Sequence, residues 1–263
     1  MLSSTYKTFQ NLSLDIVAGA VILLRFFSSQ LSVETPFMAY VLLGGSVWII
    51  YTIDHLKDSK RAKVGSRARY QFHLQYQRPL AGVIIMVLLI CLVGIFLIPS
   101  EMLLPGGLIF LLSAVYLGLH RLLANWGLKE AYIALIYTCG VLITPFALAK
   151  CVQWDIFWLL FLLTLSNLLL FSLIERKEDS DDGFDSIATV FSKEQVDRIL
   201  VVVLSVGLTT LLLGELTVVR GYFLCAFVLY VSLLANQEWA RKAQRYRILG
   251  DGVFLIPILL AWT

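Results

Sequence analysis

The sequence has 263 residues, of which 59% are hydrophobic and only 15% carry a charged side chain. Its mean hydropathy is +0.83, which is too apolar for a water-soluble domain with a polar exterior. The formal net charge of +3 comes from basic residues that cluster between apolar runs, so it reflects membrane topology and gives no reason to infer nucleic-acid binding.

Apolar runs of roughly 17 to 25 residues recur along the chain, and each can cross a hydrocarbon core of about 30 Å as a helix. Strands of a membrane barrel would alternate in polarity, whereas these runs are apolar on all sides. The sequence therefore predicts an all-α, polytopic bundle of about nine transmembrane helices in a single domain, 1–263. The expected spans are 12–28, 36–54, 79–98, 102–119, 130–149, 155–175, 197–214, 219–236 and 246–262.

The basic residues predict the orientation of these spans. If the N-terminus is inside, almost every Lys and Arg of the loops is cytoplasmic, and only Lys150 and Arg220 fall outside. We therefore expect an integral membrane protein with a cytoplasmic N-terminus. Asp15, near the start of the first span, is then either an ordinary helix-start acid or a group that orients a ligand.

The second span ends in two carboxylates, Asp54 and Asp58, which stack on one helix face because they are four residues apart. The sixth span ends in the same way, with Glu175 and Asp179. In the predicted topology both pairs lie at the cytoplasmic boundary. Three further candidate residues lie on the same two helices. Tyr51 precedes the first pair, and Asn167 and Phe171 share the helix face of the second pair at positions deeper in the membrane.

Facing carboxylate pairs repel unless a cation lies between them, and an oxygen-only ligand set suits Mg²⁺. Magnesium held by few carboxylates completes its shell with water and phosphate oxygens. The sequence therefore predicts a Mg²⁺ and diphosphate site above an apolar cavity. The candidate diphosphate ligands are Lys57, Arg61, Arg67, Arg69, Arg121 and Lys129. The alternative to a metal site is that both acidic pairs are ordinary solvated helix ends. The basic loop would then contact anionic lipids.

These motifs resemble those of the UbiA superfamily of intramembrane prenyltransferases, which carry NDxxDxxxD after the second helix and DxxxDxxxG after the sixth. Asp54 and Asp58 match the last two acids of the first motif. Glu175, Asp179 and Gly183 match the second, with Glu in place of its leading Asp. The chain departs from the pattern where Ile50-Tyr51 replaces Asn-Asp, which removes one carboxylate and one amide.

The resemblance implies Mg²⁺-assisted transfer of a prenyl group from its diphosphate to a lipophilic acceptor, often an aromatic ring in quinone biosynthesis. Metal ligation would fall to Asp54, Asp58, Glu175 and Asp179. Asp15, Tyr51, Asn167 and Phe171 would line the pocket for the acceptor or the allylic cation. Two alternatives stay open: a catalytically silent UbiA-like protein that binds isoprenoid or lipid diphosphates, and a small-solute transporter. No protein partner is identified.

Overall fold

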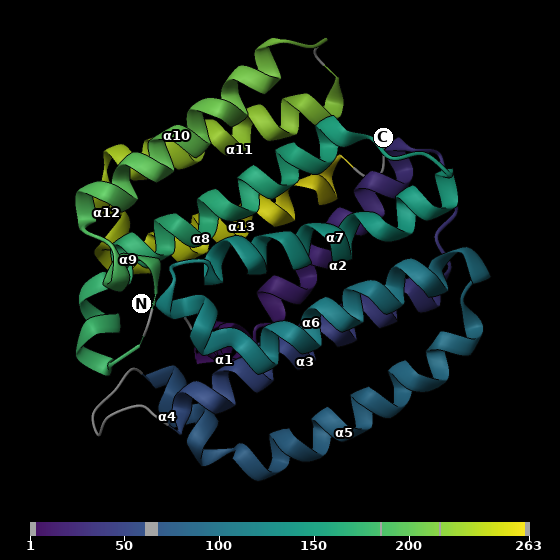
Figure 1. Ribbon diagram of the computed structural model, residues 1–263, viewed down its shortest axis with the longest axis horizontal. Helices are drawn as coiled ribbons and strands as arrows, with labels where there is room; N and C mark the ends of the chain where they lie inside the picture. The colour runs from purple at the N-terminus through teal and green to yellow at the C-terminus, as the bar shows by residue number, and fades with distance from the viewer. Residues whose placement is uncertain (1–3, 61–67, 185, 216, 261–263) are drawn as a thin grey trace.

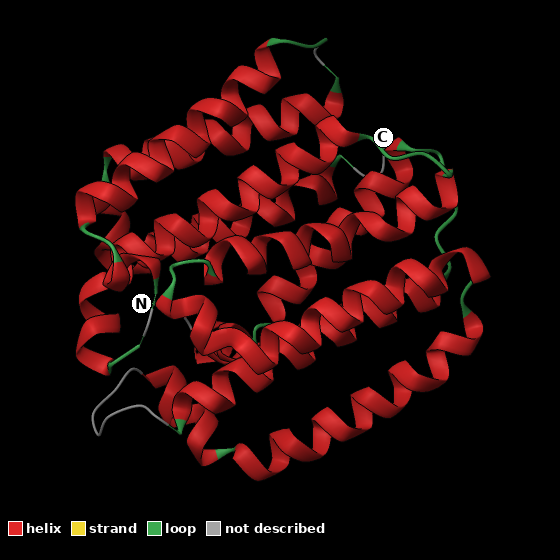
Figure 2. Ribbon diagram, viewed as in Figure 1, coloured by secondary structure: helices red, strands yellow, loops and turns green. Residues whose placement is uncertain are grey.

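The computed structural model describes residues 4–60, 68–184, 186–215 and 217–260. Within these residues every regular element is a helix, which confirms the all-α prediction (Figure 2). The α-helices are α1 (Ser4–Asn11), α2 (Leu14–Gln30), α3 (Phe37–Ser59), α4 (Ala68–Gln75), α5 (Gln77–Gly94), α6 (Leu103–Asn125), α7 (Lys129–Ala149), α8 (Trp154–Asp182), α9 (Ile187–Val190), α10 (Lys193–Leu212), α11 (Val218–Ala235), α12 (Gln237–Arg241) and α13 (Arg245–Gly252). Short 3₁₀ segments are η1 (Ile95–Leu97), η2 (Ser100–Met102), η3 (Lys242–Gln244) and η4 (Val253–Leu259).

Seven of the described helices are long and apolar enough to cross a membrane, namely α3, α5, α6, α7, α8, α10 and α11. The expected count of nine is not confirmed. Helix α2 has 17 residues, about 25 Å of helix. The last expected span is divided between α13 and η4. Two glycines and Pro257 lie in this segment, and both residue types disfavour a continuous α-helix.

Helices α2, α7 and α8 form the centre of the bundle (Figure 1). Helix α8 packs against α7 on one side and against α10 and α11 on the other, while α2 packs against α3, α7 and η4. Burial of large aromatic side chains fixes this arrangement: Phe26 and Phe27 of α2 are fully buried and contact Tyr222 and Phe223 of α11. Helices α3 and α6 follow outside the centre, and α5 lies at the edge of the bundle.

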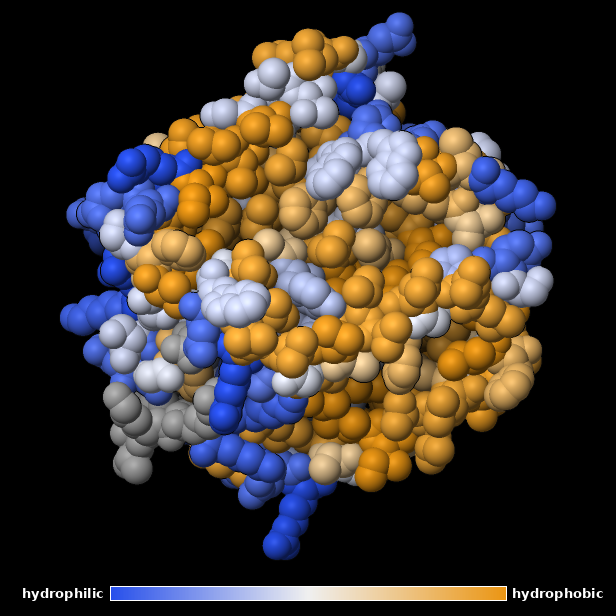
Figure 3. All heavy atoms as spheres, viewed as in Figure 1, coloured by the Kyte–Doolittle hydropathy of each residue, from blue (hydrophilic) through white to orange (hydrophobic). Residues whose placement is uncertain are grey.

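The outer helices present apolar side chains to their surroundings. On α5 and α6, residues such as Met86, Val93, Leu104 and Phe110 are more than half exposed. In Figure 3, hydrophobic atoms cover the middle of the visible face, and hydrophilic atoms gather towards its rim. Because apolar surface of this extent is stable only in lipid, the chain is a multi-pass integral membrane protein.

The end of α8 is shaped by Gly183, whose backbone adopts a left-handed conformation with φ +77°. Glycine reaches this conformation without the Cβ clash that other residues meet. The backbone N–H groups of Gly183 and Phe184 donate to the carbonyls of Ser180 and Asp179, at 3.3 and 2.8 Å, and so close the helix. The turn folds the chain back toward α9, and Phe184 and Ser186 line the same cavity as the acids of α8.

Candidate active site

All four acids that the sequence singled out line one cavity of about 220 Å³. Asp54 and Asp58 come from the end of α3, and Glu175 and Asp179 come from the end of α8. The walls are supplied by α2, α3, α4, α7, α8 and α13, together with the segment after α8. The fold thus brings together two acidic motifs that are far apart in the chain.

Asp54 is held by two neighbours. The Tyr116 hydroxyl donates to Asp54 Oδ1 at 3.2 Å, and Lys129 Nζ lies 3.9 Å from Asp54 Oδ2. Both side chains of the ion pair are mostly buried, at 19% and 15% exposure, so the charges are weakly screened by water. Lys129 is the first residue of α7. The start of α7 therefore places a cation directly beside the first acidic motif.

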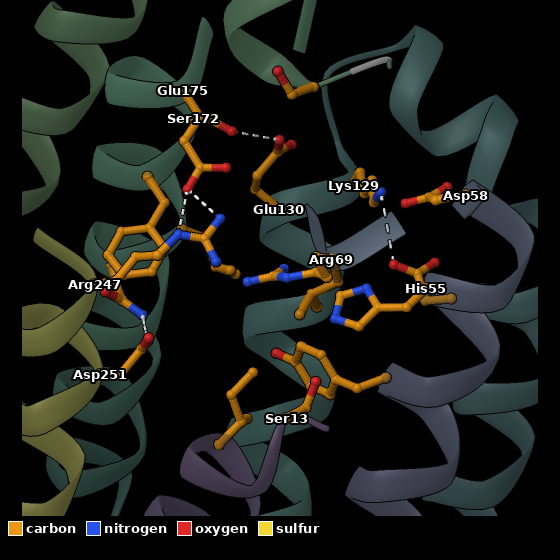
Figure 4. Close-up of a pocket in the computed structure, with 18 of the residues that line it drawn as sticks. Ser13, His55, Asp58, Arg69, Lys129, Glu130, Ser172, Glu175, Arg247 and Asp251 are labelled. Atoms are coloured by element: carbon orange, nitrogen blue, oxygen red, sulfur yellow. Dashed lines mark hydrogen bonds and ion pairs between the residues drawn. The ribbon is translucent and has the colours of Figure 1, made fainter. Parts of the chain in front are cut away.

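Glu175 has a comparable set of partners on the opposite wall. Arg247 of α13 donates from Nη2 and Nε to Glu175 Oε1, at 2.6 and 2.9 Å. The Tyr246 hydroxyl donates to the same oxygen at 2.7 Å. These contacts fix α13 against α8 and place a second cation in the cavity wall (Figure 4).

A fifth carboxylate, Glu130, lies in the first turn of α7 and lines the cavity. Its Oε1 accepts hydrogen bonds from Ser172 Oγ at 3.0 Å and from the backbone N–H of Ile187 at 2.9 Å. These bonds tie α7 to α8 and to the start of α9. The other oxygen, Oε2, is buried without a hydrogen-bond partner among the described residues. A buried carboxylate oxygen in this state needs a partner, which a bound water or cation would supply.

The short helix α4 brings Arg69 into the cavity, where Figure 4 shows it reaching between the side of Glu175 and the side of Asp58. Burial lowers the pKa of His73. His73 Nδ1 lies 2.9 Å from the Arg69 carbonyl, which only accepts, so Nδ1 carries the hydrogen. The ring of Tyr70 of α4 packs against that of Phe184 in a tilted arrangement, with 4.6 Å between ring centroids, and so joins α4 to the segment after α8.

The predicted site residues fall into three groups. Those that line the cavity are Asp15, Tyr51, Asp54, Asp58, Arg69, Lys129, Asn167, Phe171, Glu175 and Asp179. Lys57 and Arg121 are not among its lining: Lys57 Nζ donates to the Leu117 carbonyl at 2.7 Å, and Arg121 is exposed. Arg61 and Arg67 lie outside the described residues.

Sequence reasoning missed three charged residues of the cavity, Glu130, Arg247 and Asp251. Glu130 had a local signal, because it is a carboxylate in the first turn of an apolar helix. Arg247 and Asp251 lie in the last expected span, 246–262, in which the sequence singled out no site residue. Their role depends on how α13 packs against α2 and α8, which no local pattern in the sequence reports.

The donor set fits Mg²⁺, because the cavity offers carboxylate oxygens from both motifs and from Glu130. Among the described residues no three His, Cys, Asp or Glu side chains lie close enough together to form a metal site by themselves. An ion bound by the carboxylates of either motif, Asp54 and Asp58 or Glu175 and Asp179, would therefore complete its shell with water and phosphate oxygens. This is the usual coordination of Mg²⁺ at phosphate sites.

The fold and the cavity define a class of protein: a helical membrane protein with an acid- and base-lined cavity at one end of its bundle. No protein-family model matches the sequence, and no curated protein sequence matches it. The fold is similar to that of a UbiA homologue from Archaeoglobus fulgidus, solved bound to GPP and Mg²⁺ and also bound to DMAPP and Mg²⁺.

In both comparisons the TM-score is 0.67 and the identity 13%, over 97% of this chain and 99% of the other. The chain has the UbiA fold, and the resemblance that the acidic motifs suggested is confirmed at the level of the fold.

Proposed function

We propose that this chain, residues 1–263 acting as one transmembrane domain, is a divergent UbiA-type prenyltransferase. It transfers a prenyl group from a prenyl diphosphate to a lipophilic acceptor with the help of Mg²⁺. The observation that carries the proposal is the shared cavity of the two acidic motifs, with Arg69, Lys129 and Arg247 in its walls. Seven carboxyl groups and three cations around one space are costly unless they bind a charged ligand.

The chemistry follows from the position of these charges. Mg²⁺, when bound, neutralises charge that grows on the diphosphate as the bond from the prenyl carbon to oxygen breaks. Lys129 and Arg247 lie on opposite walls and donate hydrogen bonds to phosphate oxygens. Tyr51 and Phe171 offer aromatic faces to the allylic cation. The acceptor then forms the new bond to the prenyl carbon and releases a proton.

A radiolabelled transfer assay tests this function. The full-length protein, reconstituted in lipid vesicles, is given labelled geranyl or dimethylallyl diphosphate and a panel of hydroxylated aromatic acceptors. We expect a prenylated product and diphosphate release that both disappear when EDTA removes Mg²⁺. Failure with every substrate pair, while an active UbiA homologue turns over in the same vesicles, would contradict the enzyme proposal.

A catalytically silent binding protein is the second candidate, and the ion pairs in the cavity favour it. Asp54 is paired with Lys129 and Glu175 with Arg247, so two of the four motif acids already have cationic partners. Ile50-Tyr51 also stands where the family's first motif has its amide and first acid. This candidate predicts Mg²⁺-dependent binding of geranyl diphosphate in calorimetry without any product in the transfer assay.

We also propose that the cavity end of the bundle is cytoplasmic. The proposal is supported by the clustering of basic residues at that end. At the other end, Lys150 directly follows α7, and Arg220 lies in the first turn of α11. Cys151 is exposed in the short connection between α7 and α8. An impermeant maleimide added to intact cells is therefore expected to label Cys151. Labelling that appears only after the membrane is opened would reverse the orientation.

A further inference from the structure

The inner end of the cavity differs in charge from the end that carries the two motifs. Asn167 lies eight residues before Glu175 on α8, which is two turns or about 12 Å further along the helix. At this level the cavity is lined by Asn167, by Asp251 of α13 and by Asp15 of α2. The two acids meet here because α13 packs against both α2 and α8.

Asp251 is held in place by its surroundings. Asn167 Nδ2 donates to Asp251 Oδ1 at 3.4 Å (Figure 4). The preceding Gly250 allows this close approach, since a Cβ there would come within 2.8 Å of Asn167 Oδ1 and 2.7 Å of Phe171. The Tyr230 hydroxyl donates to the Gly250 carbonyl at 3.0 Å in the buried interior. The carboxyl group is therefore preorganised at the cavity wall.

Acidic side chains outnumber basic ones at this end of the cavity. The charged side chains that act on Asp251 are Asp15, Arg69 and Glu175, and Arg69 is also the cation that acts on Asp15. Glu175 is already paired with Arg247. One guanidinium thus faces two carboxyl groups, whose oxygens chiefly accept hydrogen bonds.

Aromatic side chains complete the walls at this level. Phe171 and Tyr137 line the cavity, and Phe254 packs edge-on against Tyr137 with 5.8 Å between ring centroids. Flat apolar walls of this kind match a planar ring. The inner end therefore combines surfaces for a ring with a cluster of hydrogen-bond acceptors.

We infer that the inner end is the acceptor subsite and that it selects a neutral ring bearing hydroxyl groups over a ring bearing a carboxylate. The inference rests on the proposed prenyl transfer, whose acceptor it specifies. Hydroxyl groups donate to Asp251 and Asp15, whereas a carboxylate on the ring would be desolvated beside two acidic groups. Asp251 determines this specificity, and Asn167 is a positioning residue that orients it.

Binding of three related probes tests the inference without turnover. Hydroquinone is the neutral ring, gentisate is the same ring with a carboxylate, and methyl gentisate restores neutrality at larger size. Calorimetry on the reconstituted full-length protein, under reducing conditions, is expected to give hydroquinone and methyl gentisate at least about tenfold tighter binding than gentisate. Because the two gentisates have similar size, the comparison separates charge from volume.

Two variants extend the test. Asp251→Asn is expected to weaken hydroquinone binding about tenfold and to shrink the difference between gentisate and its methyl ester. Asp155→Asn is the matched control, because Asp155 is an ion-paired acid at the start of α8 that does not line the cavity. It should leave all three affinities unchanged. Geranyl diphosphate binding, measured in a separate titration, should be retained in both variants.

Each outcome bears on one proposal. Equal or tighter binding of gentisate, no binding of any probe, or full hydroquinone affinity in Asp251→Asn would overturn the acceptor inference. If Asp251→Asn fails to fold, the ranking of the three probes on the unaltered protein still decides. Loss of geranyl diphosphate binding with the probe ranking intact would instead count against prenyl transfer and leave the subsite standing.

Discussion

Asp179→Asn is expected to lower the Mg²⁺-dependent affinity for geranyl diphosphate by about 100-fold, or roughly 2.7 kcal/mol. Asp179 lies in the last turn of α8 at the cavity wall and is 9% exposed. The substitution keeps the shape of the side chain but removes the negative charge that a hard divalent cation requires. Titration calorimetry with Mg²⁺ and again with EDTA measures the effect, because only the metal-dependent part of the affinity should fall.

Asp197→Asn is the matched control for this experiment. Asp197 is also an acid near a helix end, on α10, and it pairs with Lys193 at 3.9 Å outside the cavity. Its replacement should leave the affinity within about twofold of the original, in line with the small energies of exposed ion pairs. Equal affinities for the Asp179 and Asp197 variants would remove the second motif from the diphosphate site.

Glu175→Ala is expected to cost about 3–5 kcal/mol in the free energy of unfolding. The Glu175 and Arg247 side chains are only 13% and 14% exposed, so the substitution leaves a guanidinium with little access to water and without its Glu175 partner. It also removes the acceptor of the Tyr246 hydroxyl. Because α13 is held to α8 through this contact, the loss should appear as reduced resistance to unfolding in detergent titrations.

Two comparisons isolate the buried charge as the cause. Glu175→Gln keeps an oxygen acceptor for Arg247 and Tyr246, so a smaller loss of about 1–3 kcal/mol is expected. Asp155→Ala breaks an ion pair with Arg220 at the opposite end of the bundle, where Asp155 is 49% exposed, and about 0–1 kcal/mol is expected. The same loss from Glu175→Ala and Asp155→Ala would show that burial of the Glu175 pair contributes nothing.

Membrane insertion and helical structure were predictable from the sequence, because lipid requires each spanning segment to satisfy its own backbone hydrogen bonds. Runs of apolar residues therefore indicate the spanning helices directly. Seven of the expected spans have matching helices of sufficient length. The last expected span, 246–262, falls on α13 and η4, and Gly250, Gly252 and Pro257 in its sequence already disfavour one continuous α-helix. The four-residue spacing of the motif acids likewise placed each pair on one helix face.

Only the tertiary structure decided which side chains share the cavity. Asp251 and Arg247 reach it because α13 packs against α2 and α8, and Lys57 misses it because its amine donates to a carbonyl of α6. These outcomes depend on contacts between helices that are remote in the chain. The sequence by itself determined that the protein lies in lipid, and it determined which charged groups its helix ends offer. Helix packing determined which of these charges face one another.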